Sequence, residues 1–140
     1  MSFDMVIIGL ASVLVTAAPV VFATIGETFA ERSGVINLSV NGTIVLSAMV
    51  GFAVGVNTGS LILGYLAGMV VGACVALIIA FGSISLHQSQ VAVGFVLTYT
   101  TLSLAYFLGN PYTSRQGPTL PALPIPLISK IPILGPLFFS

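Results

Sequence analysis

Charge is the scarcest feature of this sequence. The 140 residues include three basic and three acidic side chains, which is 4% of the chain, and the formal net charge is zero. Water-soluble domains carry about 25% charged residues, so these few charges cannot cover a surface that faces water. The balance also gives no support for nucleic-acid binding or for a polybasic patch on a membrane surface.

Residues that build metal sites and active sites are equally scarce. Cys74 is the single cysteine and His87 the single histidine, so the chain can form no internal disulfide, and one histidine without neighbouring ligands makes no metal site. No phosphate-binding Gly-x-x-x-x-Gly-Lys-Ser/Thr, nucleophile elbow or pair of histidine ligands is found. We expect no catalytic residue, no metal and no cofactor bound by this chain.

Long apolar runs are what the sequence has in abundance. Hydrophobic residues make up 57% of the chain, and the mean hydropathy is +1.19. About 20 residues of helix cross the hydrocarbon core, so we predict an all-α polytopic membrane bundle with about four spans, one of them broken. Within one transmembrane region, 1–140, the predicted segments are a first span 5–25, a broken span 34–56, a third span 61–81, a fourth span 90–108, and a proline-rich loop 110–140 that leads to a missing next span.

One polar stretch, 27–42, interrupts the apolar chain and organises it. Ser33-Gly34 is a break signal, and Asn37 or Ser39 can cap a new helix. The pattern predicts a helix, a short non-helical break and a second helix whose N-terminus points into the break. The positive end of that helix dipole favours electron-rich groups of a ligand.

Polar side chains at this break are candidates to line a route for a solute, because intramembrane carboxylates tend to be functional. Other interpretations stay open. Glu31 and Arg32 fit a solvated turn at the bilayer surface, the asparagines fit a helix cap or an interhelical hydrogen bond, and Thr98 fits a bond to its own backbone. The residues predicted to line the pathway are Glu27, Asn37, Ser39, Asn41 and Thr98.

A small residue recurs at every fourth position of the third predicted span. This spacing places the residues in a smooth stripe on one helix face, which lets another helix approach closely. We interpret the stripe as a helix-packing surface without chemistry. Its members are Gly64, Gly68, Gly72, Ala76 and Ala80.

The polar stretch and the residues before it resemble the permease subunits of bacterial ABC importers for simple sugars and nucleosides. Those permeases carry Gly-Glu, then Glu-Arg-Ser-Gly-Val-Leu/Ile-Asn-Leu, then Gly-x-Glu-Gly. The segment Gln90–Gly94 is similar to the family's Asn-Gln-Val-Val-Ser-Gly. The matching residues of the first motif are Gly26, Glu27, Glu31, Arg32, Ser33, Gly34, Val35, Asn37, Leu38 and Gly42.

Three positions depart from the family pattern. Ser39 stands where glycine is usual, Asn41 where glutamate is usual, and Thr98 where asparagine is common. The departures at Asn41 and Thr98 widen the range of solutes that the resemblance implies.

The resemblance implies a multi-pass protein of the bacterial inner membrane that acts as a permease subunit. Family permeases are roughly twice as long as this chain, so the resemblance implies a half or a fragment of one. It further implies a separate ATPase subunit that binds ATP and Mg, a second permease subunit or C-terminal half, and an extracytoplasmic solute-binding protein or lipoprotein.

Two other classes of function remain open. In an ion-coupled secondary transporter or channel, Glu27 would carry a proton or sodium. A structural or assembly membrane protein would pack through the small-residue stripe and move nothing.

Overall fold

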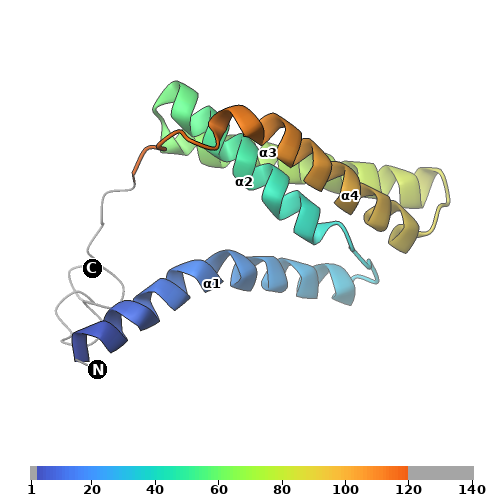
Figure 1. The fold of residues 1–140 in the computed structure, drawn as a ribbon. Helices are drawn as coiled ribbons and strands as arrows, with labels where there is room; N and C mark the ends of the chain where they lie inside the picture. Colours follow the sequence, from blue (N-terminus) through green and yellow to red (C-terminus); the bar gives the residue numbers. More distant parts are fainter. Residues whose placement is uncertain (1–2, 120–140) are drawn as a thin grey trace. The chain divides into compact units, whose positions relative to one another are not determined.

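The protein is described from a computed structural model, which describes residues 3–119. The part of the predicted proline-rich loop from residue 120 on lies outside these residues. Figure 1 shows the helices in chain order. The elements are α1 (Phe3–Arg32), α2 (Val40–Thr58), α3 (Leu61–Ala80), the π-helix η1 (Phe81–Ser85), α4 (Gln90–Gly109) and the 3-10 helix η2 (Asn110–Tyr112).

The prediction of an all-α membrane protein with four spans is confirmed. Residues 3–119 contain no strand, and four helical stretches are long and apolar enough to cross a bilayer: Met5–Arg32, Val40–Thr58, Leu61–Ser85 and Gln90–Tyr112. All four stretches end beyond the predicted spans, and the second begins at Val40 instead of residue 34. The largest extensions are those of α1, which continues past residue 25 to Arg32, and of the third span, which η1 prolongs past residue 81 to Ser85.

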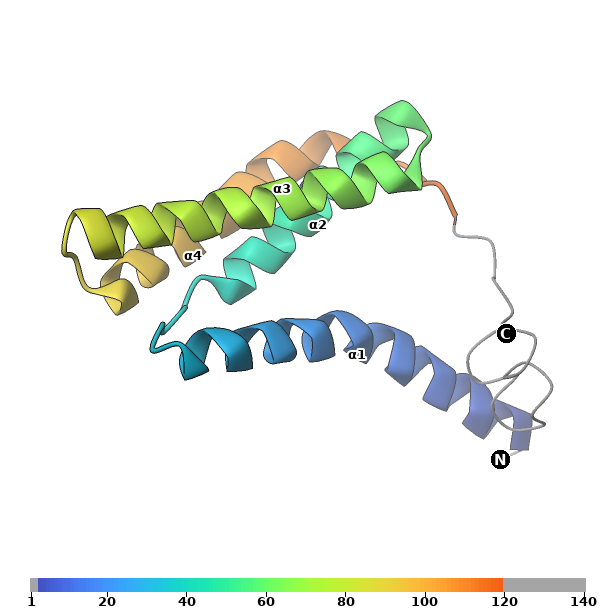
Figure 2. The ribbon, with the colours of Figure 1, turned by 180° about the vertical axis from the view of Figure 1, so that it is seen from behind.

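The described chain falls into two units, of which the larger comprises Gly26–Thr119. The part of α1 before Gly26 belongs to the other unit. This part contains Pro19, which lacks the N–H that a helix needs for its internal hydrogen bond, and the ribbon of α1 bends along its length (Figure 2). No residue in the most apolar part of α1 is buried. This is expected for a helix that is apolar on all sides and meets lipid or other helices.

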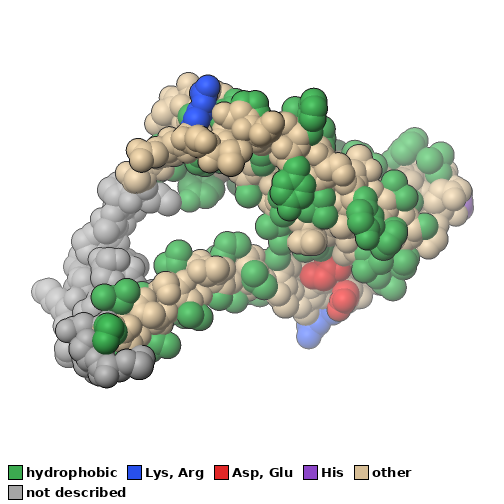
Figure 3. All heavy atoms as spheres, in the orientation of Figure 1, with side chains coloured by type: hydrophobic (Ala, Val, Ile, Leu, Met, Phe, Trp, Pro, Cys, Tyr) green, Lys and Arg blue, Asp and Glu red, His purple; other side chains and the backbone are tan. Residues whose placement is uncertain are grey.

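Helices α2, α3 and α4 pack together in the larger unit. Each successive pair is antiparallel, so that α2 and α4 run in the same direction (Figures 1 and 2). The bundle has a small core, in which Leu46, Val75, Ile79 and Ala105 are buried. Most other large apolar side chains are exposed, and they cover much of the surface in Figure 3, as lipid contact requires.

Backbone approach between α2 and α3 depends on part of the small-residue stripe. A Cβ atom on Gly64 would lie 2.7 Å from the carbonyl oxygen of Gly51, and one on Gly68 would lie 3.2 Å from that of Ser47. At Gly72 the nearest atom would be Ser47 Oγ at 3.9 Å, an ordinary contact. Further along the stripe, Ala76 is exposed and Ala80 is half-buried. The first half of the stripe therefore faces α2.

We predict that Gly64→Ala lowers the free energy of unfolding by about 1–3 kcal/mol, because the added methyl group overpacks the α2–α3 contact. Gly72→Ala is the matched control on the same helix face. It should leave the stability unchanged or raise it by up to about 1 kcal/mol, since alanine is the better helix former. Thermal unfolding followed by circular dichroism in detergent micelles measures both, and equal effects would contradict the prediction.

Candidate functional site

The candidate site is built where α1 ends. Gly34 adopts a left-handed conformation with φ 80°, and its N–H donates to the carbonyl of Glu31 at 2.9 Å while that of Val35 donates to Ala30 at 3.0 Å. These two bonds form a Schellman motif, which satisfies the last carbonyl groups of a helix. Arg32 in the last turn adds a favourable charge at the negative end of the helix dipole. The predicted break thus begins with a capped helix end.

The segment 36–38 then crosses from α1 to α2 outside the helical hydrogen bonds, since the N–H of Val35 still bonds to α1 and the carbonyl of Ser39 already accepts from Thr43. Side chains from two helices satisfy its backbone instead. The N–H of Asn37 donates to Glu27 Oε1 at 3.2 Å, and the N–H of Ile36 donates to Gln90 Oε1 at 3.0 Å. Thr98 Oγ1 donates to the carbonyl of Leu38. The break is therefore a junction to which α1 supplies one acceptor and α4 supplies one acceptor and one donor.

Within the junction, Asn37 and Ser39 bond to each other. Asn37 Oδ1 accepts from the N–H of Ser39 at 3.0 Å and from its hydroxyl at 2.7 Å, an Asx turn that leads into α2. Ser39 occupies the N-cap position, but its hydroxyl makes no cap hydrogen bond. It is fully buried, and it also lies 3.4 Å from Thr43 Oγ1. Ser39 therefore does not act as the side-chain cap that the sequence suggested.

Glycines bring α4 into contact with this junction. A Cβ atom on Gly94 would lie 3.0 Å from the backbone nitrogen of Leu38. A Cβ atom on Gly42, in the first turn of α2, would lie 2.6 Å from the carbonyl oxygen of Thr98 and would clash with the hydroxyl of Thr101. No side chain larger than hydrogen fits at Gly42 unless the helices move apart, so the start of α2 is tightly packed on α4.

The structure brings four of the five predicted pathway residues together. Glu27, Asn37 and Ser39 form one hydrogen-bonded chain, and Thr98 reaches the same segment from α4. Asn41 is exposed on the first turn of α2 and makes no side-chain hydrogen bond with any residue in 3–119. Whether any of the five contacts a solute stays a prediction.

The other polar residues weighed in the sequence lie on the surface. Glu31, Arg32 and His87 are exposed, and Figure 3 shows acidic and basic side chains gathered over the end of α1. Whether Glu31 and Arg32 form a solvated turn at the bilayer surface stays a prediction. No group of three or more His, Cys, Asp and Glu side chains that could hold a metal ion occurs within the described part of the chain.

Gln90 is the junction residue that the sequence analysis did not assign to the site. It lies 54 positions from Ile36, to which it bonds. A polar side chain at the very start of an apolar span, inside the segment similar to the family motif, was the available signal.

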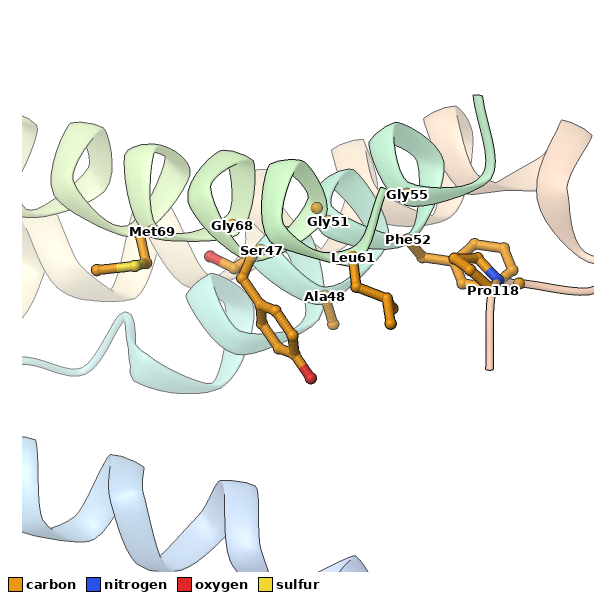
Figure 4. Close-up of a pocket in the computed structure, with 12 residues that line it drawn as sticks. Ser47, Ala48, Gly51, Phe52, Gly55, Leu61, Gly68, Met69 and Pro118 are labelled. Atoms are coloured by element: carbon orange, nitrogen blue, oxygen red, sulfur yellow. The ribbon is translucent and has the colours of Figure 1, made fainter. Parts of the chain in front are cut away.

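An apolar groove of about 720 Å³ lies elsewhere in the larger unit, along α2 and α3 (Figure 4). Gly51, Gly55, Tyr65, Gly68 and Pro118 are among the residues that line it. None of the predicted pathway residues lines it. The groove therefore follows from glycine packing and is separate from the polar junction.

Comparison with known proteins decides the family. The profile of the family described as branched-chain amino acid transport system / permease component matches residues 9–125, a range that contains the whole junction. The chain belongs to this permease family. It is a family of permeases and not of enzymes, and the four candidate spans make the chain an integral membrane protein.

Curated relatives agree with this assignment. The putative glucose ABC transporter permease protein TsgC13 of Haloferax volcanii is 35% identical over 94% of this chain and 41% of its own length. The guanosine ABC transporter permease protein NupQ of Bacillus subtilis is 30% identical over 91% of this chain and 43% of its own. The nucleoside ABC transporter permease protein NupC of Lactococcus lactis is 26% identical over 93% and 44%.

This permease chain spans less than half the length of these relatives, which agrees with the expectation that it corresponds to part of a longer subunit. No solved structure matches it significantly.

We predict that Gly34→Ala destabilises the permease chain by about 1–2 kcal/mol, because an L-residue with a side chain is strained in the left-handed conformation that ends α1. Gly34→Asn should cost less, since asparagine tolerates this conformation. Gly26→Ala is the control: apart from its own helix backbone and chain neighbours, no atom of the described residues lies within 4 Å of its Cβ position, so it should be neutral or stabilising. Thermal unfolding in micelles ranks the three variants, and a Gly34→Ala protein as stable as the control would refute the prediction.

Proposed function

We propose that this chain is part of the transmembrane permease subunit of an ATP-driven importer for nucleosides or simple sugars. The observation that carries the proposal is the similarity, over more than nine-tenths of the chain, to permeases named for glucose, guanosine and nucleosides. The junction at the break agrees with such a role, because transporters place polar groups at interrupted helices within an apolar bundle.

The importer requires partners for the work that this chain is not equipped to do. The sequence has no phosphate-binding motif, so ATP and Mg would bind a separate ATPase subunit. A second permease subunit or C-terminal half would complete the pathway across the bilayer. An extracytoplasmic solute-binding protein or lipoprotein would deliver the solute.

The start of α2 offers groups that suit a polar solute. The carboxamide oxygen of Asn37 is engaged by Ser39, whereas its nitrogen makes no hydrogen bond within the described residues. The exposed side chain of Asn41 adds a second carboxamide. These groups can donate to sugar hydroxyls and base carbonyls and accept from sugar hydroxyls. The positive end of the α2 dipole favours the same electron-rich groups.

Purification of the tagged chain from the membranes of its native host tests the proposal. We expect an ATP-binding cassette subunit and a further permease segment to co-purify, and guanosine or glucose to stimulate ATP hydrolysis by the complex when the binding protein is present. Purification without an ATPase would overturn the proposal. So would uptake that persists when ATP is depleted and follows a proton gradient, because that result indicates ion-coupled transport.

Glu27 separates these two mechanisms. We predict that Glu27→Gln keeps solute uptake by the complete transporter within about threefold of wild type, because the amide oxygen still accepts from the N–H of Asn37, and losing only the charge assistance weakens that bond by less than about 0.7 kcal/mol. Glu27→Met has a similar length and no oxygen, so it should reduce uptake by about tenfold or more.

An ion-coupled transporter would give another order. If the carboxylate carried a proton or sodium, Glu27→Gln would abolish uptake as completely as Glu27→Met. Initial rates of radiolabelled guanosine or glucose uptake, normalised to the amount of transporter in the membrane, distinguish the two patterns.

A further inference from the structure

One face of α4 matches the broken segment group by group. Gln90, Gly94 and Thr98 are spaced four apart, so they lie in a row along the helix. We call this row the docking strip. Along the opposing segment, the N–H of Ile36 meets Gln90, the backbone of Leu38 meets Gly94, and the carbonyl of Leu38 meets Thr98. Each group on α4 thus faces its complement on the break. An acceptor meets a donor at Gln90, and a donor meets an acceptor at Thr98. Between them, Gly94 has no side chain where the backbone of Leu38 approaches.

At the Gln90 end of the docking strip, the contact with the break depends on one oxygen atom. Gln90 is the first residue of α4 and is half-buried, and its Oε1 accepts from Ile36 at 3.0 Å. The neighbouring Gln88 and Ser89 are exposed, and Gln88 uses its side chain for the carbonyl of Leu86 in its own loop. The acceptor function at Ile36 is therefore specific to Gln90.

The other end of the docking strip is Thr98, which lies further along α4. Thr98 lies about 12 Å along the helix axis from Gln90, at 1.5 Å per residue. Its hydroxyl is shared between the carbonyl of Leu38 and that of Gly94 in its own helix. The break is thus fixed over a length of two helical turns, and Gly94 in the middle lets the two backbones meet without a side chain between them.

We propose that Gln90 is a positioning residue, which holds the break on the docking strip so that the start of α2 moves with α4 as one body. The break also bonds to α1, through the N–H of Asn37 to Glu27 and the N–H of Val35 to the carbonyl of Ala30. For its effect on transport the proposal rests on the function proposed above. In an importer, this division would keep the carboxamides at the start of α2 fixed relative to α4 while the end of α1 rearranges.

Two variants of Gln90 separate the acceptor from the volume of the side chain. Gln90→Glu keeps an acceptor at the same reach, and a negative charge at the first position of a helix is favourable. Gln90→Met has the same length without an acceptor. Hydrogen exchange followed by mass spectrometry, on the full chain in lipid nanodiscs, reports on the peptide that covers residues 33–41.

We expect Gln90→Met to accelerate exchange of this peptide by about tenfold at the Ile36 amide, the factor that corresponds to the loss of a hydrogen bond of ordinary strength. Gln90→Glu should exchange at the wild-type rate, and peptides from α3 should not change in either variant. Wild-type exchange in Gln90→Met would overturn the proposal. So would equal acceleration in both variants, because the acceptor would then be irrelevant.

A pair of threonines on α4 provides the matched control. Thr98 and Thr100 both bond the carbonyl four residues before them, at 3.0 Å and 2.8 Å, but Thr98 alone of the two also bonds the break. Thr98→Val should accelerate exchange in 33–41, Thr98→Ser should restore the slow rate, and Thr100→Val should have no effect. If Thr98→Val and Thr100→Val changed the exchange rate equally, the hydrogen bond from Thr98 to Leu38 would have no part in fixing the break.

Transport kinetics distinguish positioning from a merely structural contact. In the complete transporter, Gln90→Met should lower the maximal rate of guanosine or glucose uptake by about fivefold or more, a factor worth about 1 kcal/mol. The KM should stay within twofold of wild type, because the proposal gives Gln90 a role in positioning and no contact with the solute. Gln90→Glu should restore the rate. An unchanged maximal rate would overturn the role in transport. If neither solute is imported at all, the proposed function fails, while the exchange measurements still decide whether the strip docks the break.

Discussion

Every buried peptide group must have a hydrogen-bond partner, and this constraint governs the fold most strictly inside a membrane, where water cannot supply one. A continuous helix meets it by itself. An interrupted helix does not, and the interruption leaves N–H and C=O groups at 36–38 that need partners from elsewhere. Glu27, Gln90 and Thr98 are those partners. Polarity is concentrated around one stretch of an apolar chain because this is where the backbone cannot satisfy itself.

The same constraint explains how glycine is used in two different ways. At Gly34 the backbone turns left-handed to close α1, and the residue is there for its conformation. At Gly42 and Gly94 the backbone is ordinary, and the missing side chain lets α2 and the break approach α4 closely enough for hydrogen bonds between them. Since lipid tails are as apolar as the helix surfaces, close packing and these polar contacts supply the association that the hydrophobic effect supplies in water.

The spans and the break could be predicted from the sequence because both are local properties: an apolar run of membrane length, and a Ser-Gly pair within a polar stretch. The partners of the break could not, since Gln90 and Ile36 are 54 positions apart and nothing in their neighbourhoods specifies the pairing. The stripe from Gly64 to Ala80 shows the same limit. Its spacing defines a face, but α2 contacts only its first half, and beyond it Ala76 is exposed and Ala80 half-buried. The angle at which α2 crosses α3 decides where along the stripe their contact ends.

The two departures from the family pattern at the start of α2 differ in what they demand of the fold. A serine in place of the usual glycine at position 39 buries a hydroxyl completely, and an unpaired buried hydroxyl would be costly. Asn37 provides the acceptor and Thr43 lies alongside, so the departure is accommodated by local partners. Asn41 is exposed and needs no partner within the bundle. None of the hydrogen bonds of the junction involves the side chain at position 41, so a change of side chain there leaves the junction intact.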